Sequence, residues 1–160
     1  MAELSDAVHA EVLRLSSSGD EFASDGKYAE AIGQYERALE LLPKPRHDWD
    51  AFTWLKVAIA DAYFYEKRFD KVCDVMKEVM LLGPEENGAN TFIQLRYGQA
   101  LLEAGKEDLA ADWLARAFLT KGRKLFMEDD RKYLDFICSK LLPPAGFTSW
   151  EEVFAEEDES

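Results

Sequence analysis

The sequence predicts an all-α protein, a solenoid of three helix pairs closed by a C-terminal capping helix and a short acidic tail. Three segments, which begin near residues 13, 54 and 92, repeat one pattern of residue types. Ala31, Val72 and Ala110 share a column, so the offsets between segments are 41 and 38 residues. The same offsets recur in further columns, which are Gly19 with Ala60 and Gly98, Phe22 with Tyr63 and Leu101, Tyr35 with Met76 and Leu114, and Ala38 with Val79 and Ala117. Length and composition agree, because 160 residues that are 48% hydrophobic suffice for one domain with a core.

The shared columns explain why each segment predicts two antiparallel helices. Small residues at Gly19, Ala60 and Gly98 allow the paired helices to approach closely. Aromatic residues at positions 22, 35 and 63 fill the space between them. Each pair then leaves an apolar face that only the next pair can cover, so the pairs must stack.

These columns resemble the tetratricopeptide repeat, in which a glycine turn separates two helices and a proline follows the second helix. The repeats are expected near 12–45, 53–86 and 91–124. The first matches best, with Gly26 at the turn and Pro43 at the end, whereas the second has Lys67 at the turn. In the third, Gly122 replaces the terminal proline. The resemblance implies a right-handed solenoid, with longer connections than usual around 43–49 and 84–90.

A capping helix is expected over 129–142, which completes a tetratricopeptide domain over 1–145. Asp129 and Asp130 supply N-cap chemistry, apolar residues follow at helical spacing, and Pro143 with Pro144 ends the helix.

The acidic tail over 146–160 starts with a second amphipathic segment. Ser149 and Glu152 have the spacing of a capping box, and Trp150, Val153 and Phe154 share one helical face. We expect disorder over 155–160, because AEEDES carries too little apolar surface to fold.

The net charge of −13 limits the classes of partner. Both ends of the chain are acidic around a neutral middle, and such a surface repels phosphate backbones and attracts basic proteins. Direct nucleic-acid binding is therefore not expected. No uncharged stretch approaches the roughly 20 residues of a membrane span, and the N-terminus lacks the pattern of a signal peptide. We expect a cytoplasmic protein in which Cys73 and Cys138 are reduced.

Nothing in the sequence indicates catalysis, a cofactor or a metal site. His9 and His47 lie 38 residues apart, and neither has a companion at metal-ligand spacing. Phosphate-binding, dinucleotide-binding and nucleophile-elbow motifs are absent. The pairs Glu85–Glu86 and Asp129–Asp130 are interpreted as helix caps and solvated charges. We therefore expect a protein that is not an enzyme.

The resemblance implies a concave groove lined by the first helix of each pair. Its positions in the first repeat are Leu13, Ser16 and Asp20. In the second and third repeats the expected partner-binding residues are Trp54, Val57, Asp61, Phe64, Tyr65, Phe92, Leu95, Arg96, Gln99 and Glu103, with Leu102 beside them. Large aromatic residues with arginine are typical of protein-binding hot spots. The alternative is self-occlusion, in which the capping helix or Trp150 and Phe154 of the tail fill the groove.

The groove residues exclude one function that the family resemblance offers. Members that clamp the C-terminal carboxylates of the chaperones Hsp70 and Hsp90 use basic and asparagine side chains. Here Ser16, Asp20, Asp61 and Phe92 stand at such positions, and only Arg96 is basic. Two aspartates would repel an acidic peptide, so a clamp of this kind is not expected.

A finer resemblance rests on two longer stretches, WDAFTWLKVAIADAYFYEKRFD and the stretch from GANTFIQLRYGQ to DDRKYLDF. They look like small bacterial tetratricopeptide proteins found beside secreted polymorphic toxins. This resemblance implies an immunity protein that binds and neutralises a toxin domain, and the acidic charge agrees with a basic target. A chaperone or adaptor for a secreted protein and a scaffold subunit are the alternatives.

Overall fold

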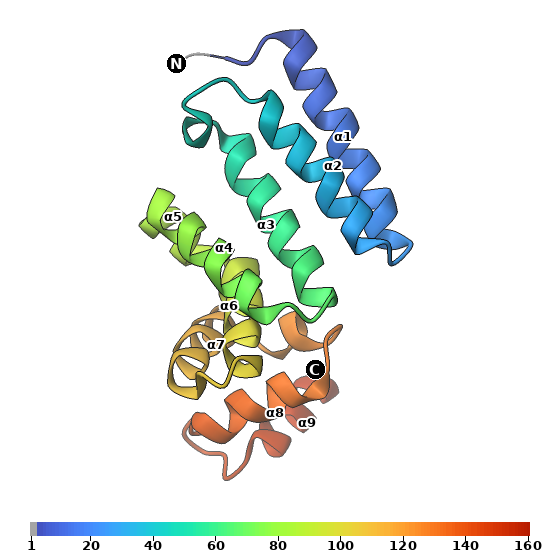
Figure 1. Cartoon of the computed structure of the whole chain (residues 1–160). Coiled ribbons are helices and arrows are strands. Elements are labelled where there is room, and N and C mark those ends of the chain that lie inside the picture. Colours follow the sequence, from blue (N-terminus) through green and yellow to red (C-terminus); the bar gives the residue numbers. More distant parts are fainter. Residues whose placement is uncertain (1–2) are drawn as a thin grey trace.

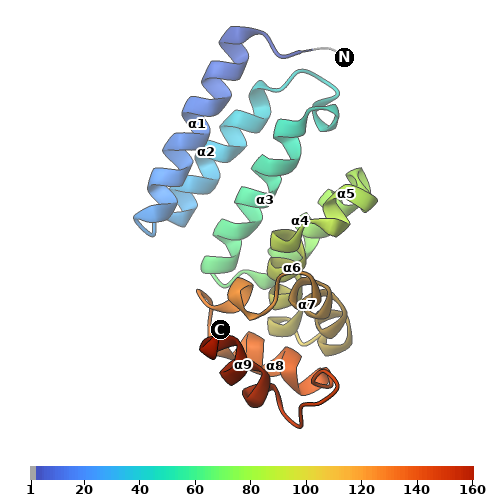
Figure 2. The ribbon, with the colours of Figure 1, turned by 180° about the vertical axis from the view of Figure 1, so that it is seen from behind.

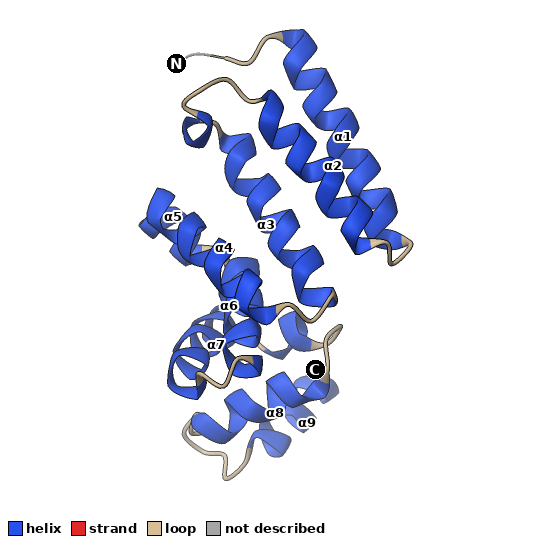
Figure 3. Cartoon of the chain, in the orientation of Figure 1, coloured by secondary structure: helices blue, strands red, loops and turns tan. Residues whose placement is uncertain are grey.

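The computed structural model describes residues 3–160, and every regular element in that range is a helix (Figures 1 and 3). Within this part of the chain, no helix combines the length and apolarity that crossing a bilayer requires. The longer helices are α1 (Asp6–Ser24), α2 (Tyr28–Leu41), α3 (Asp50–Tyr65), α4 (Phe69–Leu82), α6 (Thr91–Glu103), α7 (Glu107–Lys121), α8 (Arg131–Lys140) and α9 (Trp150–Glu159). Helix α5 (Pro84–Ala89) and the 3₁₀ turns Arg46–Asp48 and Arg123–Phe126 are shorter.

The three predicted helix pairs are α1 with α2, α3 with α4, and α6 with α7. Close approach within a pair depends on the small residues that the columns indicated. A Cβ atom on Gly98 of α6 would lie 2.7 Å from Cγ of Leu114 on α7, which leaves no room for a side chain. Gly19 of α1 faces the ring of Tyr35 on α2 in the same way. The all-α class and the paired arrangement predicted from the sequence are confirmed.

The buried side chains form two clusters that meet at α3. Helices α1, α2 and α3 lie side by side in one layer, α4 packs beside α3, and α6 to α9 gather at the other end of the molecule (Figures 1 and 2). The N-terminal cluster includes Val12, Leu15, Ile32, Tyr35 and Leu55. The C-terminal cluster includes Phe64, Met76, Leu101, Leu114, Phe126 and Ile137. Because α3 contributes to both clusters, it joins the two halves of the protein.

Helix α8 packs as a cap on the C-terminal cluster. The side chain of Asp130 accepts a hydrogen bond from the amide of Lys132 (2.9 Å), which is the N-cap contact. Tyr133, Leu134 and Ile137 are buried on one side of α8.

The tail differs from the sequence expectation, because α9 continues through most of 155–160, to Glu159. The rings of Trp150 and Phe154 lie 5.1 and 6.5 Å from that of Phe118 on α7. Arg123 then holds the acidic end, with its Nε 3.1 Å from Glu157 and a second ion pair to Asp158. The tail therefore packs against the C-terminal end of α7 and the 3₁₀ turn that follows it, and does not fill a groove along α3.

Both cysteines lie in the described part of the chain and are free thiols, as expected. Cys73 is buried and Cys138 is half-buried. Burial raises the pKa of the Cys138 thiol to about 11, which leaves it protonated and unreactive at neutral pH.

The turn between α3 and α4 carries backbone strain. Lys67 has φ of 60°, whereas Gly26 and Gly105 occupy the corresponding turns with φ of 75° and 78°. We expect Lys67→Gly to raise the free energy of unfolding by about 1 kcal/mol, because a left-handed backbone penalises a residue with a Cβ atom. The melting temperature should rise by about 3 °C in thermal unfolding followed by circular dichroism.

Gly105→Ala is the matched control for this prediction. A Cβ on Gly105 meets nothing within 4 Å, so alanine there tests the backbone cost alone and should lower the melting temperature. An unchanged or lower melting temperature for Lys67→Gly would contradict the strain.

Candidate functional site

One stripe of α3 carries the candidate site. Trp54, Ala58, Asp61 and Tyr65 follow at intervals of three or four residues, so they lie on a single side of the helix. Two hollows lie at the ends of this stripe, and both include residues of α1 or the chain leading into it. We call the two hollows and the stripe between them the α1–α3 face.

The first hollow, at the C-terminal end of α3, has a volume of about 500 Å³. Asp20 of α1 and Asp61 of α3 line it together with Tyr28 and Tyr65. The two tyrosine rings are stacked, with centroids 5.3 Å apart and planes 12° from parallel. The hydroxyl of Tyr35 donates a hydrogen bond to Asp20 (2.7 Å), and burial raises the pKa of Tyr35, so it stays a neutral donor. The hollow thus combines two carboxylates with aromatic walls.

The second hollow, at the N-terminal end of α3, has a volume of about 420 Å³. Its carboxylates are Glu3, Asp6 and Asp50, and its aromatic residues are Trp49 and Trp54. The indole N–H of Trp49 donates to the carbonyl oxygen of Pro43 (2.8 Å), which fixes that ring. Among the residues that the structure describes, no lysine or arginine lines either hollow. The α1–α3 face therefore presents a negative potential beside exposed aromatic rings.

A buried arginine of α6, Arg96, joins the α1–α3 face to the C-terminal half of the protein. Arg96 is 4% exposed, and its Nε lies 2.8 Å from Oδ1 of Asp61. Its guanidinium also donates to Oε1 of Gln99 (2.8 Å) and to the hydroxyl of Tyr65 (3.4 Å). The amide of Gln99 donates in turn to Asp129, ahead of α8 (2.8 Å). This network ties α3, α6 and the segment before α8 together.

Aromatic rings surround the same guanidinium. Its central carbon lies 4.2 Å from the ring centroid of Phe64, 5.3 Å from that of Tyr65 and 5.2 Å from that of Phe92. Contacts of this kind stabilise a cation that has been removed from water. The positive charge of Arg96 is therefore satisfied inside the protein.

Asp61 stands between Arg96 and open solvent. Burial raises the pKa of its carboxyl group above the ordinary range, Arg96 partly offsets this increase, and the charge of Asp129 adds to it. About a third of the Asp61 side chain is exposed in the first hollow. A second cation there would favour the ionised carboxylate, so the electrostatics of this position suit a positively charged ligand group.

The α6 side of the expected groove differs from the sequence prediction. Leu95, Arg96 and Gln99 are buried, as is Phe64 of α3. Asp129, ahead of α8, contacts Arg96 and Gln99, and the ring of Tyr133 on α8 lies 6.3 Å from that of Phe64. The hydroxyl of Tyr133 also donates to Glu103 (2.7 Å). These four side chains are at most 9% exposed, so they present almost no surface to a partner. The segment before α8 therefore lies over Arg96 and Gln99, whereas Phe92 near the start of α6 is 36% exposed.

The other predicted site residues lie at or near the surface. Trp54, Tyr65 and Phe92 are 40%, 47% and 36% exposed. Asp61, Val57 and Glu103 are half-buried, and Val57 packs against the C-terminal cluster with Leu102. In the first repeat Leu13 and Asp20 are exposed and Ser16 is buried.

Several residues of the hollows were missed by the sequence reasoning. These residues are Glu3, Asp6, Tyr28, Tyr35, Trp49 and Asp50. One signal was present, because Asp50 precedes Trp54 and Asp61 precedes Tyr65 by the same four residues. Helical spacing places each aspartate beside its aromatic residue, which marks two similar places on α3.

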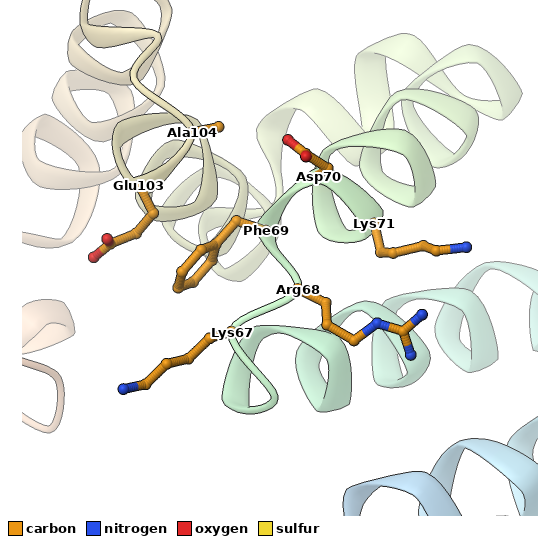
Figure 4. A pocket seen from close by; sticks show the side chains of 7 residues that line it. All are labelled: Lys67, Arg68, Phe69, Asp70, Lys71, Glu103 and Ala104. Atoms are coloured by element: carbon orange, nitrogen blue, oxygen red, sulfur yellow. The ribbon is translucent and has the colours of Figure 1, made fainter.

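A third hollow, of about 520 Å³, lies at the turn between α3 and α4 (Figure 4). Three cationic side chains border it, but Lys67 points to one side and Arg68 and Lys71 point to the other. Arg68 is paired with Glu66 and lies over the ring of Tyr63. These charges do not converge on one point, so this hollow lacks the arrangement of a binding site.

Comparison with solved structures supports the fold. The first tetratricopeptide domain of human RPAP3 has a TM-score of 0.60 at 23% identity, covering 81% of this chain and 94% of that one. The first such domain of Spaghetti (RPAP3), solved with the HSP90 peptide SRMEEVD, has a TM-score of 0.59 at 20% identity, covering 80% and 88%. The N-terminal domain of stress-induced protein-1 from C. elegans has a TM-score of 0.59 at 18% identity, covering 82% and 98%.

No family model and no curated protein matches the sequence. The helix pairs and these likenesses show that the chain has the tetratricopeptide-repeat fold.

Proposed function

We propose that the protein is a non-catalytic binding protein that holds a basic protein partner on the α1–α3 face. The observation that carries this proposal is the composition of the two hollows, in which five carboxylates and several aromatic rings lie without a lining lysine or arginine among the described residues. The occluded α6 side moves the proposed site toward the N-terminal half. Trp54, Asp61 and Tyr65 are kept from the sequence prediction, and Asp20 joins them.

Long-range and short-range forces favour the same kind of partner. A net charge of −13 accelerates encounter with a basic protein through electrostatic steering. Once the partner is in contact, the exposed rings of Trp54 and Tyr65 provide anchors of the type that dominate binding energy at interfaces. The two effects act on different rate constants, since steering changes association and anchoring changes dissociation.

The finer role that we propose is that of an immunity protein, which neutralises a toxin domain by covering it. The resemblance of two long stretches to immunity proteins and the acidic binding face support this role. A chaperone or adaptor is the second candidate, because a solved structure of the same fold is bound to a peptide of HSP90. A scaffold subunit is the third. A clamp for acidic chaperone tails is not proposed, because Asp20 and Asp61 would repel such a tail.

Salt dependence tests the electrostatic part of the proposal. The partner is captured on the immobilised protein from the source cells, identified by mass spectrometry and purified. Its association rate should fall at least about tenfold between about 50 and about 500 mM salt, whereas dissociation should change little. Biolayer interferometry measures both rate constants. An association rate that does not depend on salt would contradict binding through the acidic face.

Growth assays separate the candidate roles. If the partner is a toxin domain, its production alone should stop growth, and co-production of this protein should restore it. For a chaperone, the partner should be harmless, and its secretion should fall when this protein is deleted. Neither effect is expected of a scaffold subunit.

A further inference from the structure

The two hollows of the α1–α3 face are built alike. In each, α3 provides an aspartate with an aromatic residue four positions later, Asp50 with Trp54 and Asp61 with Tyr65. Helix α1 adds one carboxylate to each hollow, Asp6 to one and Asp20 to the other. Trp49 is the second aromatic residue of the N-terminal hollow, which Glu3 and His9 also line, and Tyr28 and Tyr35 are the further aromatic residues of the C-terminal hollow. The similarity indicates that both hollows receive the same chemical group.

The group that fits is a guanidinium. Arg96 shows how two of these residues hold one, since its Nε lies 2.8 Å from Asp61 and its terminal nitrogen lies 3.4 Å from the hydroxyl of Tyr65. A planar guanidinium can pair with a carboxylate and stack on an aromatic ring at the same time, which an ammonium does less well. The two hollows contain five carboxylates, and the single positive charge of Arg96 can neutralise only one of them.

The spacing of the hollows points to a helical ligand. Equivalent residues of the two hollows are eleven positions apart on α3, or about 16 Å along its axis. A partner helix lying along α3 has the same rise, so its residues eleven positions apart match this distance and share one face. In an extended chain the same distance corresponds to about five residues, whose side chains point in opposite directions.

We propose that one basic helix of the partner lies along the α1–α3 face and places two arginine side chains, eleven residues apart, in the two hollows. This inference rests on the proposed function, and it adds the conformation of the partner segment and the spacing of its anchors. Binding two linked groups gives higher affinity than binding either one, because the second binds at a high effective concentration.

Two helical peptides with the same composition test this proposal. Both are alanine-based chains of about 20 residues with a fluorescent label. One carries two arginines eleven residues apart, and the other carries them seven residues apart, which also places both on one face but only about 10 Å apart. In fluorescence anisotropy at low salt, the eleven-spaced peptide should bind at least about tenfold more tightly. Equal affinities, or no binding of either peptide, would overturn the proposal.

A substitution in one hollow provides the second measurement. Asp50→Asn alters the N-terminal hollow and leaves the Arg96 network intact. This substitution should remove most of the difference in affinity between the eleven-spaced and the seven-spaced peptide. It should change the affinity of the seven-spaced peptide by less than about threefold. Glu36→Gln, on exposed α2 surface away from both hollows, is the control and should change neither. If the advantage persists in Asp50→Asn, the two-anchor proposal is wrong.

The natural partner distinguishes failure of this inference from failure of the proposed function. If Asp20→Lys weakens binding of the natural partner and Asp50→Asn leaves its affinity unchanged, the partner binds the face through a single anchor. That result would overturn the helix with two arginines and leave the proposed function standing. If neither substitution changes the affinity of the natural partner, both the two-arginine helix and the proposed function would be overturned.

Discussion

A chain that ends at residue 127 is expected to lose at least about 4 kcal/mol of unfolding free energy, and its melting temperature should fall by about 10 °C or more. The truncation removes the buried residues Tyr133, Leu134 and Ile137 of α8, which cover the C-terminal cluster. Fully burying a large apolar side chain contributes about 1.5–3 kcal/mol, so the loss of three exceeds what most single substitutions cause. Thermal unfolding with light scattering would measure the destabilisation and any aggregation.

Truncation after Ala155 is the control for the effect of chain shortening. It removes the ion pairs of Arg123 with Glu157 and Asp158, whose carboxylates are mostly exposed. Exposed pairs contribute little, so we expect less than about 1 kcal/mol. A chain ending at residue 127 that melts like the full-length protein would show that α8 is not a cap.

Arg96→Ala is expected to lower the free energy of unfolding by about 3–5 kcal/mol, because it leaves buried partners without their cation. Asp129 and Gln99 lose their shared donor, and Asp61 loses its nearest positive charge. Chemical denaturation followed by tryptophan fluorescence would measure the loss. Arg116→Ala is the matched control, since Arg116 forms an exposed pair with Asp112 and should cost less than about 0.5 kcal/mol.

The effect of pH gives this prediction a second readout. A carboxyl group whose pKa is raised in the folded state favours folding while it is protonated, and this contribution is lost as pH rises through the raised value. In Arg96→Ala the pKa of Asp61 should rise further, because the attraction that lowered it is gone. The stability difference from wild type should therefore narrow as pH falls from 7 toward about 4. A difference of 1 kcal/mol or less at pH 7 would contradict a structural role for the network.

The sequence predicts the helix pairs because their determinants are local. The close packing of Gly98 against Leu114 and of Gly19 against Tyr35 is predicted by small and large residues that recur at the same offsets in the three repeats. Helix α5 was expected only as part of a longer connection. Its signal was present, since Pro84 stands at its first turn with Glu85 and Glu86 beside it.

The site was predicted less completely because helical periodicity identifies a face but not what covers it. Arg96 and Gln99 share a side of α6 with Phe92, which suits a groove. Whether that side is open depends on where Asp129 lies, and this is set by the distant packing of α8 on the C-terminal cluster. The helical tail has the same kind of cause, since Arg123 and Phe118 are more than 25 residues from the segment that they hold.

Binding of the purified partner to three variants tests the central claim most directly, once circular dichroism shows that each variant is folded. By calorimetry, Tyr65→Ala should weaken binding about thirtyfold, and Asp20→Lys should weaken it more because it replaces attraction with repulsion. Glu36→Lys makes a comparable charge change on α2, away from the α1–α3 face, and should stay within about threefold of wild type. Wild-type affinity in Tyr65→Ala and Asp20→Lys, with loss of binding in Glu36→Lys, would contradict the account and place the partner on the opposite surface.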